Sequence, residues 1–404
     1  MGTLGRWWCR AGSPLSAVMT LAALVATVTD SARAQDVVVE PGRGLTVSAG
    51  DVFATTLRAR VQIRNTLRID GSAVDDVFEL RTARIWWTGH VLDPHLRYGL
   101  QLALGANDFE SGNASPIFDG FVESTHLREL NVRVGQFFVP FDRARTIREF
   151  SLQTVDRTEV VRELTLDRDV GIVASSTDVF GLGGRLAYWI GFFGGDGRNR
   201  LVTASQQTPD VGFLYTARVS VRPMGGFDDD SEGDLSRSPE PRLAIGAGVA
   251  FNHRTDRPRS TTGTVDPHAR FDYFHAAGDL VLKWYGISLL AEVVLRESTQ
   301  DAVAWTDPAT MTNGTSYARN GWGYLAQLGV MVHDAVELWA RWEHLEPIRP
   351  VAPDAIRSQR GLGGGLNVYL HGHALKLQAD WTHSFADDFL TGPHLVRVQL
   401  DASF

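Results

Sequence analysis

The residues of this sequence with the clearest chemistry are arginines at alternate positions of one short segment. Residues 57–70 read LRARVQIRNTLRID, and an extended chain places four basic side chains on one side: Arg58, Arg60, Arg64 and Arg68. Alternate residues of a strand lie about 6.6–6.8 Å apart. Guanidinium groups stay charged and bind phosphate through two hydrogen bonds, so this row could pass an anion along the chain. The alternative interpretation is that each arginine pairs with a carboxylate and only stabilises the structure.

Strands are the elements that would position these arginines. In residues 57–70 the apolar side chains alternate with the polar ones, and a helix would mix the two sets. Segments of the same kind follow to the end of the chain, at about 78–91, 95–106, 116–125, 129–138, 169–177, 182–194, 211–222, 242–253, 270–284, 287–297, 319–332, 335–345, 360–370, 374–385 and 394–404. The fold class that this predicts is all-β, an antiparallel up-and-down barrel of about sixteen strands.

The connections between these segments alternate between short and long, which is typical of outer-membrane barrels with short periplasmic turns and long outer loops. The exception is 223–241, which falls where a short turn belongs and is long and acidic. We expect it to be a solvated turn. Its Asp228-Asp229-Asp230 run lacks the glutamate spacing and the flanking helices of a calcium loop.

The end of the sequence indicates a membrane barrel rather than a soluble all-β protein. Residues 394–404 (HLVRVQLDASF) place apolar side chains and the final Phe404 on one face. This resembles the signature through which the barrel-assembly machinery recognises outer-membrane proteins. We therefore expect a multi-pass barrel in the outer membrane of a Gram-negative cell, surrounded by lipid and lipopolysaccharide.

The start of the sequence resembles a secretory signal. Arg6 and Arg10 precede an apolar run of 15–28, and Ala32-Arg33-Ala34 is a cleavage pattern. The alternative, a membrane anchor, needs a longer apolar run of about 20 residues. The predicted organisation is a cleaved signal at 1–34, a short periplasmic lead-in at 35–50 and the barrel at 51–404.

Several function classes have no support in the sequence. The formal net charge is −8, so no basic patch for nucleic acid is expected. The single cysteine, Cys9, lies in the predicted signal. The histidines lack metal-ligand spacing, and no motif of a zinc peptidase, a serine hydrolase or a phosphate-binding glycine loop occurs. We expect no metal, no cofactor and no enzyme activity.

A family resemblance rests on three segments in order: 133–141 (RVGQFFVPF), 168–172 (RDVGI) and 188–197 (YWIGFFGGDG). Together with the acidic turn and the segment after it, they resemble the phosphate-selective porin O and P family. The resemblance implies a sixteen-stranded outer-membrane porin, a homotrimer, and a channel whose arginines and lysines guide phosphate or polyphosphate. This sequence has only two lysines, Lys283 and Lys376, so a lysine cluster is absent.

The polar face of each strand should line the lumen, because an arginine on the lipid face costs about 2–4 kcal/mol at the bilayer midplane. Basic residues outnumber acidic ones on that face. This predicts a pore for passive diffusion of small solutes, with a preference for small anions. The candidate pore-lining residues are Arg58, Arg60, Arg64, Arg68, Arg84, Arg97, Arg133 and Arg218.

The long connection 139–168 is the candidate constriction. Its candidate basic residues are Arg143, Arg145, Arg148, Arg157 and Arg162, and it also holds six acidic residues: Asp142, Glu149, Asp156, Glu159, Glu163 and Asp167. It could narrow the pore or plug it. The alternatives to a diffusion pore are a plugged structural barrel and an outer-membrane barrel enzyme.

Overall fold

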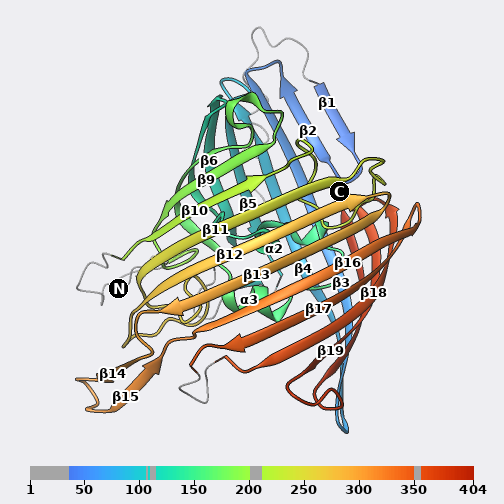
Figure 1. Ribbon diagram of the computed structural model, residues 1–404. Helices are drawn as coiled ribbons and strands as arrows, with labels where there is room; N and C mark the ends of the chain where they lie inside the picture. The colour runs from blue at the N-terminus through green and yellow to red at the C-terminus, as the bar shows by residue number, and fades with distance from the viewer. Residues whose placement is uncertain (1–35, 106–107, 110–114, 201–211, 350–355) are drawn as a thin grey trace, which may run out of the picture.

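A computed structural model describes residues 36–105, 108–109, 115–200, 212–349 and 356–404. Sixteen antiparallel strands form one closed barrel (Figure 1). They are β3 (Phe53–Asp70), β4 (Ala73–Val91), β5 (Leu96–Ala103), β6 (Ile117–Leu127), β7 (Leu130–Phe138), β8 (Arg168–Ser176), β9 (Leu186–Phe193), β10 (Leu214–Val221), β11 (Arg242–Thr255), β12 (Phe271–Trp284), β13 (Ile287–Ser298), β16 (Gly321–His333), β17 (Val336–Pro347), β18 (Gln359–His371), β19 (Leu375–Phe385) and β20 (His394–Ser403). Each predicted segment coincides with one of them, and the predicted all-β barrel is confirmed.

The last strand closes the barrel against the first one. β20 pairs with β3 from His394 opposite Ile69 to Ser403 opposite Arg60. Phe404 extends this ladder, since its N–H donates to the Ala59 carbonyl and its own carbonyl accepts from the Ala59 N–H. Closure leaves neither β3 nor β20 with a long unpaired edge.

Strand β10 shows how the alternating sequence produces the two faces of the wall. Thr216, Arg218 and Ser220 point inward and are buried, whereas Tyr215 and Val219 point outward and are exposed. Along the other strands the exposed outward side chains are again mainly apolar. An apolar outer face is what lipid requires, and the polar inner face is shielded from it.

Two β-hairpins lie outside the barrel wall. β1 (Asp36–Glu40) and β2 (Gly44–Ala49) pair with each other, and β2 also pairs with the first residues of β3 in antiparallel orientation. They fall within the expected lead-in, 35–50, while the predicted signal at 1–34 lies outside the described residues. At the opposite end of the barrel, β14 (Ala302–Thr306) and β15 (Asn313–Tyr317) form a hairpin inside the long connection between β13 and β16, where no strand was predicted (Figure 1).

None of the helices that the structure describes is long and apolar enough to cross a membrane.

The connection 139–167 folds into the barrel instead of covering it. It carries α2 (Arg143–Thr146), the 3-10 turn η2 (Glu149–Ser151) and α3 (Glu159–Leu164), and Figure 1 shows both helices within the ring of strands. A second 3-10 turn, η3 (Val179–Gly181), lies in the β8–β9 connection. α3 packs against β13, β16 and β17. Apolar residues of this connection form a core inside the barrel with inward side chains of the strands and with Ile356 of a later connection. The core residues are Phe137, Val139, Phe141, Val160, Leu164, Leu166, Val173, Phe193, Leu214, Ala250, Ala277, Val294, Leu345 and Ile356.

The acidic segment between β10 and β11 also folds inward, and the expectation of a solvated turn was wrong. Asp229, Glu232 and Asp234 are 4%, 5% and 1% exposed. Asp229 forms ion pairs of 2.9 Å with both Arg143 and Arg222. Inward cations on neighbouring elements can neutralise a buried carboxylate, and the composition of the segment alone does not reveal them.

Candidate functional site

The inward segments fill one side of the barrel and leave two water-accessible cavities on the other. The larger has a volume of about 770 Å³ and the smaller about 420 Å³. The strand residues that line them belong to β3–β10, and residues of the two inward segments complete their walls. On the filled side, Gln153 donates hydrogen bonds to Ser288 and Glu337. The water-accessible space is therefore off the barrel axis.

A thin layer of side chains separates the two cavities. Arg84, Phe138, Glu149, Arg157 and Arg168 line both of them. The larger cavity reaches the periplasmic side, where residues of short turns such as Thr177 and His373 line it. The smaller one reaches the side of the long loops. This layer is the narrow region of the lumen.

Both cavities carry an excess of positive charge. Ten arginines and five carboxylates line the larger cavity. Eight arginines and four carboxylates line the smaller one. An anion inside either cavity is therefore attracted by the net charge of the walls, whereas a cation is repelled.

The structure places most of the predicted site residues on these walls. The larger cavity is lined by Arg60, Arg84, Arg97, Arg133, Arg143, Arg148, Arg157 and Arg218. The smaller cavity is lined by Arg64, Arg84, Arg145, Arg157 and Arg162. Arg58 lines a small niche beside the larger cavity. Arg68 lines none of the three and pairs with Asp70 at the loop end of β3.

The arginines at the centre of the β3 row are engaged in structural pairs. Arg60 donates two hydrogen bonds to Asp401, at 2.8 and 2.6 Å. Arg64 donates to Asp156 at 2.6 Å and to Gln399. Both side chains are buried. This geometry matches the alternative interpretation of the row, in which arginines stabilise the wall, and it leaves these two guanidiniums little capacity for a passing anion.

Two carboxylates of the inward loop are held by several arginines each. Glu149 lies 3.0 Å from Arg84, 3.5 Å from Arg157 and 3.9 Å from Arg60. Asp156 in turn contacts Arg64, Arg81 and Arg397.

Burial opposes ionisation of Glu149, but its arginines outweigh this and hold the pKa of the carboxyl well below its usual range. The loop is thus fixed to the wall by permanent charges.

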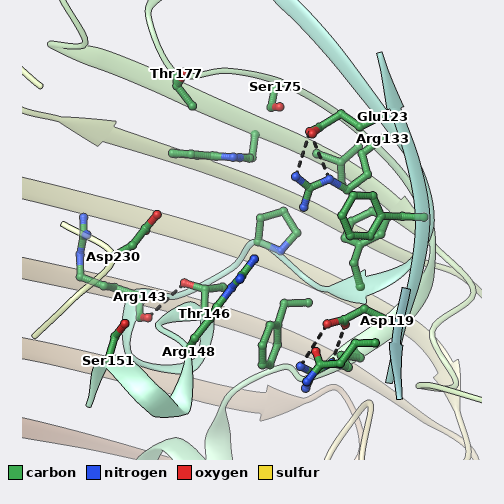
Figure 2. A pocket seen from close by; sticks show the side chains of 18 of the residues that line it. Asp119, Glu123, Arg133, Arg143, Thr146, Arg148, Ser151, Ser175, Thr177 and Asp230 are labelled. Atoms are coloured by element: carbon green, nitrogen blue, oxygen red, sulfur yellow. Dashed lines mark hydrogen bonds and ion pairs between the residues drawn. The ribbon is translucent and has the colours of Figure 1, made fainter. Parts of the chain in front are cut away.

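Arg148 is the arginine best placed to meet a solute. It is exposed within the larger cavity and makes no ion pair or side-chain hydrogen bond with any residue that the structure describes. Figure 2 shows its side chain extending from the inward loop into open space, whereas Arg133 is held by Glu123. Arg97 is also exposed and donates only to the Pro94 carbonyl among the described residues.

Two functional features were missed in the sequence. Arg168 belongs to the separating layer, pairs with Asp119 at 2.7 Å and stacks on Phe138 and Phe118, at 3.6 and 4.2 Å from the ring centres. In the sequence, Arg168-Asp169 contributed only to the family resemblance and was not predicted as a site residue pair. Arg81 contacts the loop carboxylate of Asp156. It sits at a register shift between β3 and β4, which alternation alone does not reveal.

The described part of the chain contains no cluster of histidine, cysteine, aspartate and glutamate that could hold a metal ion.

Solved structures of outer-membrane proteins share this fold at low sequence identity. OmpT of Vibrio cholerae matches with a TM-score of 0.54 and 9% identity, over 88% of this chain and 98% of its own. The anion-selective porin from Comamonas acidovorans matches with a TM-score of 0.52 and 11% identity, over 87% of this chain and 100% of its own. The outer-membrane channel DcaP of Acinetobacter baumannii matches with a TM-score of 0.55 and 9% identity, over 87% of this chain and 98% of its own.

No protein-family model matches the sequence, and no curated protein is similar to it. The resemblance to the phosphate-selective porin O and P family thus gains no support beyond the porin-type barrel. These similarities show the fold, which is that of a Gram-negative outer-membrane barrel.

Proposed function

We propose that this chain is an outer-membrane porin for passive diffusion of small solutes, with a preference for anions. One observation carries the proposal: arginines outnumber carboxylates two to one around both cavities, and Arg148 lines the larger one without a partner among the described residues. Rings of arginine are a known means of selecting anions in pores. The structural neighbours include a protein described as an anion-selective porin, which agrees with this assignment.

The pairing of the other arginines suits passage rather than capture. Most guanidiniums around the narrow layer have a carboxylate partner, such as Arg84 with Glu149 and Arg168 with Asp119. At this narrow layer a moderate net potential remains, without several unpaired charges at one point. Conduction requires binding weak enough for the ion to leave, which this distribution provides.

Phosphate is one candidate solute, because a guanidinium group can donate two parallel hydrogen bonds to two phosphate oxygens. The two lysines do not add to this site. Lys376 donates to the carbonyls of Phe150 and Leu152, and Lys283 donates to the Asp228 carbonyl and the Ser231 hydroxyl. Both lysines therefore hold the inward segments in place.

Ion selectivity in planar bilayers tests the proposal. Purified protein should give stable conductance steps, and its reversal potential in a KCl gradient should have the sign of chloride preference. Added phosphate should reduce the chloride current if phosphate competes for the same path. Cation preference would overturn the anion assignment, and folded protein without any conductance would favour the plugged structural barrel.

Assembly belongs to the same proposal. A trimer is expected from the family resemblance, and one neighbouring structure, OmpT of Vibrio cholerae, is described in a trimer form. Light scattering of the detergent-solubilised protein would give the number of chains. A monomer would remove the trimer from the proposal without affecting the pore.

A further inference from the structure

A small niche opens from the larger cavity on its periplasmic side. Its volume is about 70 Å³, and its wall includes the hairpin turn at Gly42. Trp86, Arg148, Phe150 and His373 line both the niche and the larger cavity, so the two spaces adjoin. Arg58 of β3 completes the polar wall of the niche.

The niche brings together two cations that form no ion pair within the described part of the chain. Arg58 and Arg148 make no ion pair with any described residue, and the Nε of Arg58 is buried without a hydrogen-bond partner. The Nδ1 of His373 is likewise buried without a partner. Burial and the nearby Lys376 and Lys283 lower the pKa of this histidine to about 3, so it is neutral. Two adjacent cations beside unsatisfied polar atoms create a demand for an anion that the described chain does not meet.

The remaining wall of the niche is apolar and aromatic. Trp86 and Phe150 meet edge to face with ring centres 6.3 Å apart, and Ala59 and Ala374 line the same space. A doubly charged, strongly hydrated phosphate would lose its water against these surfaces without compensation. A carboxylate carries a single charge and can bring an apolar body that covers the rings.

From this arrangement we infer that the niche is a binding subsite for small carboxylates with a flat apolar body, such as aromatic acids. The carboxylate lies between Arg58 and Arg148, and the body extends along Trp86 and Phe150 into the larger cavity. This inference deepens the proposed porin function, on which it rests, by naming a class of solute. The subsite adjoins the larger cavity through four shared lining residues, so a solute held there can also be released into it.

Calorimetric titration of the full-length protein in detergent tests the subsite without relying on conduction. The probes are benzoate, acetate and inorganic phosphate. Benzoate should bind at least about tenfold more tightly than acetate or phosphate, since only benzoate meets both the arginines and the rings. This comparison uses the unaltered protein, so it does not depend on how any variant folds.

Three variants locate the binding. Arg58→Gln and Trp86→Leu should each weaken benzoate binding about tenfold or more, the first by removing a charge-assisted hydrogen bond and the second by removing the aromatic surface. Arg185→Gln is the matched control, because this arginine is exposed at the periplasmic edge and lines none of the cavities. Benzoate affinity should be unchanged in it.

The outcomes separate the two proposals. Phosphate binding as tight as benzoate, or equal benzoate affinity in Trp86→Leu and the unaltered protein, would overturn the subsite. Absence of benzoate binding together with chloride preference in bilayers would do the same and leave the porin function standing. Benzoate binding without chloride preference would support the subsite and refute the anion-preferring pore.

Discussion

Reversing the charge of Arg148 should reverse much of the ion preference of the pore. Arg148 has no described partner, so Arg148→Glu breaks no ion pair and leaves the inward loop in place. The larger cavity has a volume of about 770 Å³. A sphere of that size has a radius of ~6 Å, so a passing ion comes within ~6 Å of the wall charges.

The size of the effect follows from this distance. In water the interaction energy between a monovalent ion and a unit charge at ~6 Å is about 0.7 kcal/mol, and screening at ~0.1 M salt lowers it to about 0.4 kcal/mol. The substitution changes the wall by two charges and acts with opposite sign on chloride and potassium. The difference between the interaction free energies of chloride and potassium with the wall should therefore change by about 1.5 kcal/mol. The chloride-to-potassium permeability ratio should fall about tenfold as a result.

The assay is the reversal potential of single channels in a KCl gradient. Arg185→Glu makes the same change of charge at the exposed periplasmic edge, outside the cavities, and should change the ratio less than about twofold because of screening. Equal shifts in the two variants would mean that total charge rather than the cavity sets selectivity. An unchanged ratio in Arg148→Glu would refute the assignment of this cavity to the conduction path.

Three further predictions test the structure around the pore. Glu149→Gln removes the shared partner of Arg60, Arg84 and Arg157 and should destabilise the folded barrel by about 2 kcal/mol. The measurement is the temperature at which the protein loses its compact migration on a gel, and an unaltered temperature would mean that these contacts do not anchor the loop. Val249→Arg places a cation on the exposed lipid face of β11 and should reduce the free energy of unfolding by about 2–4 kcal/mol, whereas Val249→Ala should have little effect. The measurement is urea unfolding in lipid vesicles, and equal stability of the two variants would contradict the lipid-facing assignment. The lowered pKa of Glu149 means that its stabilising contribution is complete above the unfolded value near ~4.3 and is lost as pH falls through the folded value, so Glu149→Gln should lower the unfolding temperature equally at about pH 7 and pH 5. A smaller difference at the lower pH would contradict the ion-pair geometry.

The strands were predictable because their signal is local. In β10 the alternation of Thr216, Arg218 and Ser220 with apolar residues suffices to identify a strand and its two faces. The hairpin β14–β15 was missed although Val303 and Trp305 alternate with small residues, because two five-residue strands give a weak signal inside a long connection.

The pairing of the site residues was not predictable in the same way. Arg60 and Asp401 are 341 positions apart and meet only because β20 closes onto β3 in one register. The inward fold of the acidic segment similarly depends on Arg143 and Lys283, which come from distant parts of the chain. Composition identified these charges, and only the closed barrel determines which of them remain unpaired.

The off-axis position of the cavities divides the barrel into a half that lines the water-accessible space and a half that supports the inward segments, and these halves are also largely separate in sequence. Strand residues up to β10 touch the solute path, while β11–β20 support the inward segments from behind. Exchanging the part up to residue 241 between barrels of this type should transfer permeability, since Arg222, Asp228 and Asp230 also line the larger cavity, and variation in the later part would be limited mainly by folding. A channel with new selectivity can thus be sought by randomising one contiguous stretch of the gene.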